Sequence, residues 1–120
     1  MKYMTILFSV LLLAGCVQPN SVPDDVIPEE KMILVLTDIH LLEGAFMSTQ
    51  FMNQDSVKKV AISGYNTIFK KYSITEQEYK KSWDFYMKNP DIADPMYEQV
   101  IENINILQNE ALQKSAKKQK

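Results

Sequence analysis

The chain has 120 residues, of which 46% are hydrophobic, and a formal net charge of −2 at neutral pH. This length supports one domain with a modest core rather than several domains. Apart from a single histidine, every basic side chain is a lysine, so arginine, which clamps phosphates with two parallel hydrogen bonds, is missing. A slightly acidic chain without arginine argues against nucleic acid as a partner.

A lipoprotein secretion signal is predicted at residues 1–15. Lys2 supplies the positive start, and an apolar stretch of about ten residues follows from Thr5 to Ala14, which is too short to span a bilayer as a helix. Small residues then precede Cys16, as in a lipobox, where a signal peptidase cuts and the cysteine receives acyl chains such as palmitate. Cys16 is the only cysteine, which excludes an intramolecular disulfide. The alternative interpretation is an uncleaved anchor or a buried N-terminal helix.

The segment after the cysteine is expected to be a lipidated, flexible tether at residues 16–27. It contains Pro19 and Pro23 among polar residues and shows no apolar period. A helical domain is expected at 28–113, followed by a basic tail at 114–120.

These features predict a lipid-anchored protein of the bacterial cell envelope. An acidic run directly after the lipidated cysteine resembles a signal for export to the cell surface. In this chain Val17-Gln18-Pro19-Asn20 follows the cysteine instead. We therefore expect the protein at the outer membrane, on its periplasmic face.

Apolar residues at helical spacing predict four helices and therefore a small all-α bundle. The first is expected to start at Pro28, with Glu29 and Glu30 in its positive first turn. The second is expected from Asp55 to Tyr72. The third is expected to open with a capping box at Thr75–Glu78 and to end before Asn89-Pro90, and the fourth to begin at Asp94-Pro95.

Three ionisable side chains interrupt the apolar first helix: Asp38, His40 and Glu43. His40 and Glu43 are three residues apart and can meet on one face, whereas Asp38 points elsewhere. The functional interpretation is a metal ligand or a general base at His40 and Glu43. The structural interpretation, which we favour, is a satisfied histidine and two surface acids, because a metal site needs further His or Cys ligands.

Two glycines, Gly44 and Gly64, fall inside helical patterns, where each costs about 1 kcal/mol relative to alanine. If the first two helices form an antiparallel hairpin turning near Met52, His40 faces Gly64. We therefore expect Gly64 either to make room for the imidazole or to let the two helices approach closely.

Aromatic residues crowd the short third helix. Tyr79, Trp83 and Tyr86 form a stripe at helical spacing, and Phe85 lies partly outside it. Such a stripe is more often core than ligand site, yet an exposed aromatic patch is typical of a surface that binds another protein. The candidate interaction residues are therefore Tyr79, Trp83, Phe85 and Tyr86.

Four motifs carry a family resemblance, at Ile27–Met32, Leu36–Glu43, Ile68–Thr75 and Ser82–Tyr86. Together with the lipobox they resemble a family of small Bacteroidetes lipoproteins that carry one domain of unknown function. The resemblance covers about Val26 to Leu112 and implies a location and a helical fold, without an activity or catalytic residues. Members often carry glycine where this chain has Ser73, so the second helix is expected to end differently.

The predicted function is that of a non-enzymatic, membrane-anchored module that binds another envelope protein as a scaffold or chaperone. The alternatives are an enzyme or metal-binding protein centred on His40 and Glu43, or an accessory lipoprotein that stabilises a complex. We expect no cofactor beyond the covalent lipid on Cys16. The expected partners are the membrane, through the lipid, and an envelope protein, without nucleic acid.

Overall fold

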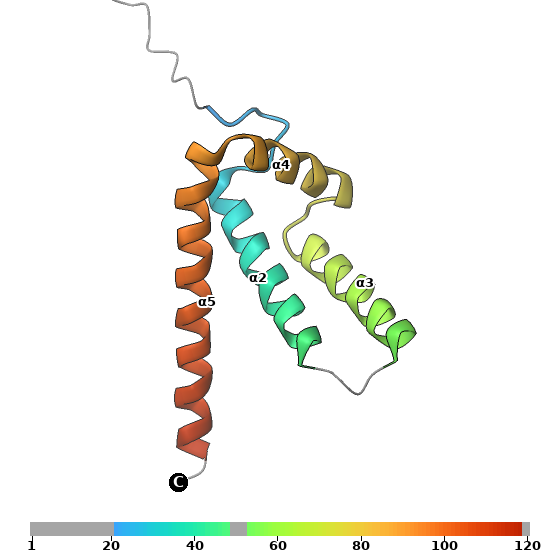
Figure 1. The fold of residues 1–120 in the computed structure, drawn as a ribbon, viewed down its shortest axis with the longest axis vertical. Coiled ribbons are helices and arrows are strands. Elements are labelled where there is room, and N and C mark those ends of the chain that lie inside the picture. Colours follow the sequence, from blue (N-terminus) through green and yellow to red (C-terminus); the bar gives the residue numbers. More distant parts are fainter. Residues whose placement is uncertain (1–20, 49–52, 119–120) are drawn as a thin grey trace, which may run out of the picture.

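A computed structural model describes residues 21–48 and 53–118. Within these ranges it contains four helices (Figure 1): α2 at Glu29–Met47, α3 at Gln54–Lys71, α4 at Glu76–Lys88 and α5 at Pro90–Lys118. No strand occurs within these described ranges. The predicted all-α bundle of about four helices is confirmed.

Helix α2 is the central element. It packs against α3 on one side and α5 on the other, while α4 crosses the end of the layer and packs on α5 (Figure 1). Met32, Val35, Leu36 and Ile39 of α2 are at most 2% exposed, because an apolar helix flanked on two sides buries most of its circumference.

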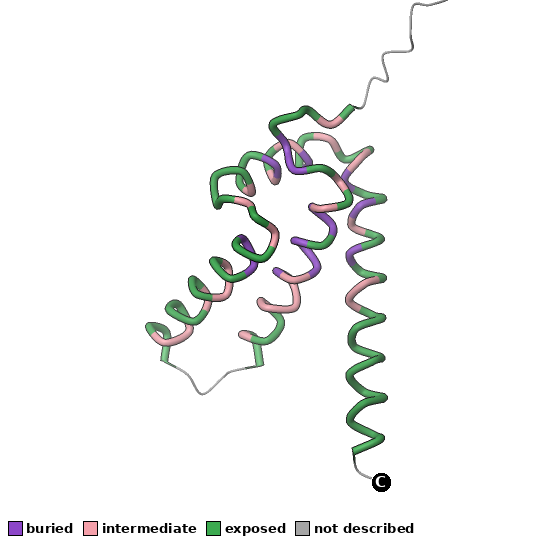
Figure 2. Tube along the Cα trace, turned by 180° about the vertical axis from the view of Figure 1, so that it is seen from behind, coloured by how far each residue is buried: buried purple, intermediate pink, exposed green. Residues whose placement is uncertain are grey.

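Two connected clusters form the core. The larger lies under α4 and contains Met32, Leu36, Tyr86, Met96 and Val100. The smaller joins Val35 and Ile39 of α2 to Ile68 and Phe69 of α3. Figure 2 shows that buried positions gather toward the end that α4 crosses, whereas the far end of α5 is exposed.

The structure corrects the inner end of the expected tether. Val26 and Ile27 are only 5% and 6% exposed and belong to the core. The Ile27 N–H donates to Ser82 Oγ at 2.8 Å, and the Tyr86 hydroxyl donates to the Ile27 carbonyl at 2.7 Å. Both α4 side chains thus pair backbone groups that burial would otherwise leave unsatisfied. Val26 and Ile27 therefore belong to the folded domain and not to the tether, although Pro23 precedes them.

The last helix begins earlier than predicted. It starts at Pro90, a favoured first helical residue, and the Asn89 carbonyl accepts bonds from Ile92 and Ala93. Pro95 therefore lies inside the helix, where it removes one backbone donor near the start. Because α5 continues to Lys118, most of the expected basic tail is the end of this helix.

The predicted capping box is confirmed. Thr75 Oγ1 accepts from the Glu78 N–H at 3.1 Å, and Glu78 Oε2 accepts from the Thr75 N–H at 2.6 Å. These bonds lower the pKa of the Glu78 carboxyl below its usual value. They satisfy two free donors at the start of α4 and fix the turn that joins it to α3.

Helix α3 ends in a Schellman turn. The Ile74 N–H donates to the Phe69 carbonyl and the Ser73 N–H to the Lys70 carbonyl, and Ser73 has φ 53°. This left-handed conformation favours glycine. Helix α3 therefore ends in the motif that a glycine usually forms, with Ser73 in the position of that glycine.

We predict that Ser73→Gly stabilises the protein by about 0.5–1 kcal/mol, because it removes the steric cost of a left-handed residue. Urea unfolding would measure the change. The matched control is Ser63→Gly in the exposed interior of α3, which is expected to destabilise by roughly 0.5 kcal/mol. Equal effects of the two substitutions would contradict the prediction.

Gly64 lies against Leu42, and not against His40 as expected. A Cβ atom at Gly64 would lie 2.6 Å from Leu42 Cδ1 and 3.2 Å from its Cγ. Gly64 therefore lets α2 and α3 approach closely, as the second of the two expectations has it. The histidine expectation is wrong because the two helices pair two residues further along α2.

We predict that Gly64→Leu destabilises the protein by about 1–3 kcal/mol, because the added side chain would push α3 away from α2. The matched control is Gly44→Ala, where an added Cβ meets nothing within 4 Å, and where helix propensity predicts a gain of about 0.5–1 kcal/mol. Thermal unfolding checks both, and an unchanged melting temperature for Gly64→Leu would refute the close-approach role.

Candidate functional site

The three ionisable candidates in the middle of α2, Asp38, His40 and Glu43, divide as expected. His40 Nδ1 lies 3.4 Å from Glu43 Oε2, with the two side chains 36% and 46% exposed. Asp38 lies on another side of the helix, where its Oδ2 accepts from Lys71 Nζ at 2.7 Å and from the Tyr72 hydroxyl at 2.9 Å. Asp38 therefore ties α2 to the end of α3 and does not belong to the His40–Glu43 pair.

Glu43 also binds a tyrosine of α3. The Tyr65 hydroxyl donates to Glu43 Oε1 at 2.6 Å. Burial, and then the hydrogen bond and negative charge of Glu43, raise the pKa of Tyr65 to about 12. One carboxylate thus joins a histidine of its own helix to a tyrosine of the next.

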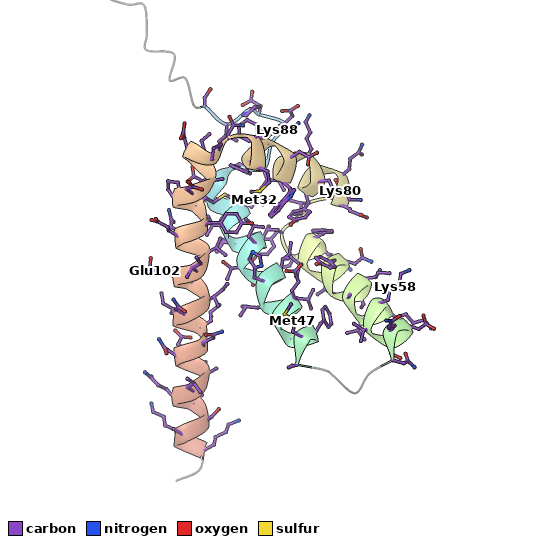
Figure 3. The ribbon with its side chains drawn as sticks, viewed as in Figure 1. Met32, Met47, Lys58, Lys80, Lys88 and Glu102 are labelled. Carbon is purple, nitrogen blue, oxygen red and sulfur yellow. The ribbon has the colours of Figure 1, made fainter. Side chains whose placement is uncertain are left out.

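Six aromatic rings form a continuous chain around this carboxylate, which we call the aromatic arc. Successive ring centroids are 5.3–6.4 Å apart, within the range of favourable ring pairs. The arc runs from α3 over α4 to α5 and ends on α2, through Tyr65, Phe69, Tyr79, Trp83, Tyr97 and His40. Figure 3 shows side chains filling the space that α2, α3 and α4 enclose.

The hydroxyls of the arc lie in the negative field of Glu43. Burial raises the pKa of Tyr79 well above its usual value, and the charges of Tyr97, Tyr65 and Glu43 add to this effect. Burial and Glu43 likewise raise the pKa of Tyr97. The charge of Glu43 therefore acts on tyrosines of three helices, of which Tyr65 is hydrogen-bonded to it.

Two shallow grooves border the arc and share Tyr79 and Lys80. One, of about 290 Å³, lies between α3 and α4, and the other, of about 270 Å³, follows α4. Their walls are mainly apolar and aromatic, and their polar residues are Asn66, Glu76, Lys80 and Asp84. This combination of an apolar floor and a polar rim is typical of surfaces that receive another polypeptide.

The aromatic candidates of the sequence separate into two groups. Tyr79 and Trp83 belong to the arc and are partly exposed. Tyr86 is fully buried and holds Ile27, and the Phe85 ring packs edge-on against it. The expectation of an interaction surface is therefore wrong for Tyr86, which lies in the core. Phe85 is partly exposed, like Tyr79 and Trp83, but does not belong to the arc.

Three members of the arc were not singled out by the sequence: Tyr65, Phe69 and Tyr97. Their spacing assigned them to the apolar stripes of their helices. The signal that could have found two of them is the hydroxyl, since tyrosine in a stripe of aliphatic residues marks an edge where a polar group is reachable.

Among residues 21–48 and 53–118, no group of three or more His, Cys, Asp or Glu side chains is arranged to hold a metal ion. None of the helices in the same ranges combines the length and hydrophobicity of a membrane span. The lipidation candidate, Cys16, lies outside the described residues.

The fold and the arc define a small all-α domain with an aromatic face on one side of its central helix. Residues 23–110 match the model of a domain of unknown function, DUF4296, and the chain belongs to this family. No curated protein and no solved structure matches the chain.

We predict that the free energy of unfolding decreases as the pH rises from about 10 to about 12. Tyrosines of the unfolded chain have a pKa of about 10, whereas burial raises the pKa of Tyr65 and Tyr86 in the folded state to about 12. The folded state therefore binds more protons than the unfolded state between these pH values. The stability that the raised pKa values contribute is fully present below pH about 10 and is lost as the pH rises to about 12. Urea unfolding at several pH values measures the slope.

Tyr65→Phe is the matched variant for this measurement, because it removes one of the shifted groups and keeps the ring. Its stability is expected to fall less steeply with pH than that of the natural chain. Identical slopes for the two proteins would show that the pKa of Tyr65 is not raised in the folded state.

Proposed function

We propose that this protein is a lipoprotein of the bacterial cell envelope, anchored through acyl chains on Cys16, whose helical domain binds another envelope protein. The domain acts as a non-enzymatic scaffold or chaperone-like module, and the binding surface is the aromatic arc with its two grooves. The similarity to small Bacteroidetes lipoproteins and the residues after Cys16 support the outer membrane and its periplasmic face.

The observation that carries the binding role is the arc itself. Aromatic side chains from three helices meet on one partly exposed face, although a domain of this size gains more by burying them. Exposed aromatics that cluster beside an apolar groove are the side chains that dominate binding energy at protein interfaces. The grooves, of about 290 and 270 Å³, suit a few inserted side chains of a partner.

The arrangement of the chain ends favours a protein partner over the anchoring membrane. The described chain begins in the blue segment before α2, at one end of the molecule, whereas α5 ends at the opposite end (Figure 1). With 29 residues, α5 is about 43 Å long, so its terminal lysines point away from the end at which the lipid would be attached. Lys114, Lys117 and Lys118 are therefore poorly placed to contact the headgroups beside the anchor.

A second candidate function is catalysis or metal binding at His40 and Glu43. Its support is the 3.4 Å approach of the two side chains and the partial exposure of both. Metal titration followed by the resonances of His40, the only histidine, separates this candidate from the first. Resonances that do not move with Zn²⁺ would count against it.

The test of the binding role is crosslinking in the native membrane from a photoreactive residue at position 80. Lys80 borders both grooves and its side chain is 71% exposed, so it can be replaced without loss of packing. We expect one dominant crosslinked protein for a scaffold and many unrelated outer-membrane clients for a chaperone. The matched control carries the photoreactive residue at the exposed position 102 of α5.

Two further variants complete the test. Trp83→Ala is expected to reduce the crosslink from position 80 at least severalfold, since it interrupts the arc between Tyr79 and Tyr97 and leaves the photoreactive residue in place. Cys16→Ala is expected to abolish the crosslink by releasing the protein from the membrane. Equal crosslinking from positions 80 and 102, or no crosslink from either, would refute binding through the arc.

A further inference from the structure

The side of α2 that carries Asp38 holds a complete arrangement of three groups. The Asp38 carboxylate accepts from the Tyr72 hydroxyl, and Lys71 both pairs with Asp38 at 2.7 Å and lies 5.0 Å from the centre of the Tyr72 ring. A carboxylate and an aromatic face together thus hold a cation.

The Glu43 side repeats two of these groups. The Tyr65 hydroxyl donates to Glu43 Oε1 at 2.6 Å, as Tyr72 does to Asp38. Among the described residues, however, no lysine lies within ion-pair distance of Glu43. The nearest basic group is His40, at 3.4 Å, which is longer than a strong charge-assisted hydrogen bond of about 2.7–2.9 Å.

The surroundings of Glu43 favour a positive charge. Three tyrosine rings and the Trp83 indole belong to the same arc, and the faces of such rings attract cations. After the larger effect of burial, the negative charge of Glu43 also raises the pKa of Tyr65, Tyr79 and Tyr97. The Glu43 side chain is 46% exposed, so a partner can reach it.

We propose that Glu43, which the two terminal residues of the aromatic arc, Tyr65 and His40, both approach, binds a lysine or arginine side chain of the partner protein. The cation would pair with Glu43 and lie over the rings, in the position that Lys71 takes beside Asp38 and Tyr72. This inference rests on the proposed binding function and names the chemistry of the segment bound: a basic residue next to apolar ones that enter the grooves.

The test is titration of the folded protein with butylguanidinium and butylammonium, with the neutral butanol as the matched probe. The chain has one tryptophan and one histidine, and both lie in the arc, so the Trp83 indole and His40 imidazole resonances report binding there. We expect saturable shifts with the two cations and at least severalfold smaller shifts with butanol.

Glu43→Gln keeps the size of the side chain and removes its charge. It is expected to weaken cation binding about tenfold, which corresponds to about 1.4 kcal/mol. Glu102→Gln on the exposed side of α5 is the matched control and should leave binding unchanged. Tyr65→Phe, which keeps the ring and removes the hydroxyl bonded to Glu43, is expected to weaken it less than Glu43→Gln does.

Equal shifts with butanol and the cations, or unchanged cation binding in Glu43→Gln, would overturn the proposal. Neither result would change the crosslink expected from position 80, because that crosslink reports any partner bound in the grooves. Conversely, cation binding without any crosslinked protein would refute the binding function and leave the cation site standing. The two ideas therefore fail separately.

Discussion

The burial of α2 between α3 and α5 is the constraint on which the rest of the structure depends. Met32, Val35, Leu36 and Ile39 lose nearly all contact with solvent, and they contribute to both clusters of the hydrophobic core. A helix covered on two opposite sides leaves its other two sides to polar residues. Asp38, His40 and Glu43 lie on these two sides and contact side chains of the neighbouring helices.

Helix α3 and the residue that caps its end each supply a tyrosine to a carboxylate on α2. Tyr65 and Tyr72 are seven residues apart, which is about two helical turns, and donate to Glu43 and Asp38 respectively. Gly64 allows this close approach, since a side chain there would meet Leu42. The same contact that fixes the two helices therefore positions the carboxylate at the centre of the candidate site.

The sequence identified part of that site. Tyr79, Trp83, His40 and Glu43 were found because each interrupts a pattern or clusters on a short helix. Phe69, Tyr65 and Tyr97 fit their apolar stripes, and a stripe does not reveal which of its residues a neighbouring helix covers. Tyr86 shows the opposite error. It lies in the same stripe as Trp83 and was expected at the surface, but it is buried in the core, where its hydroxyl donates to the Ile27 carbonyl.

What the sequence determined by itself is local: four helices, the Thr75–Glu78 capping box and the meeting of His40 with Glu43 all depend on residues within four positions of one another. The tertiary structure decided what depends on distant partners. Ile27 is buried because Ser82 and Tyr86 receive its backbone, and the arc exists because α4 brings its rings between those of α3 and α5. Periodicity fixes which face of a helix is apolar, whereas the register between helices is set by side-chain packing that no single stripe contains.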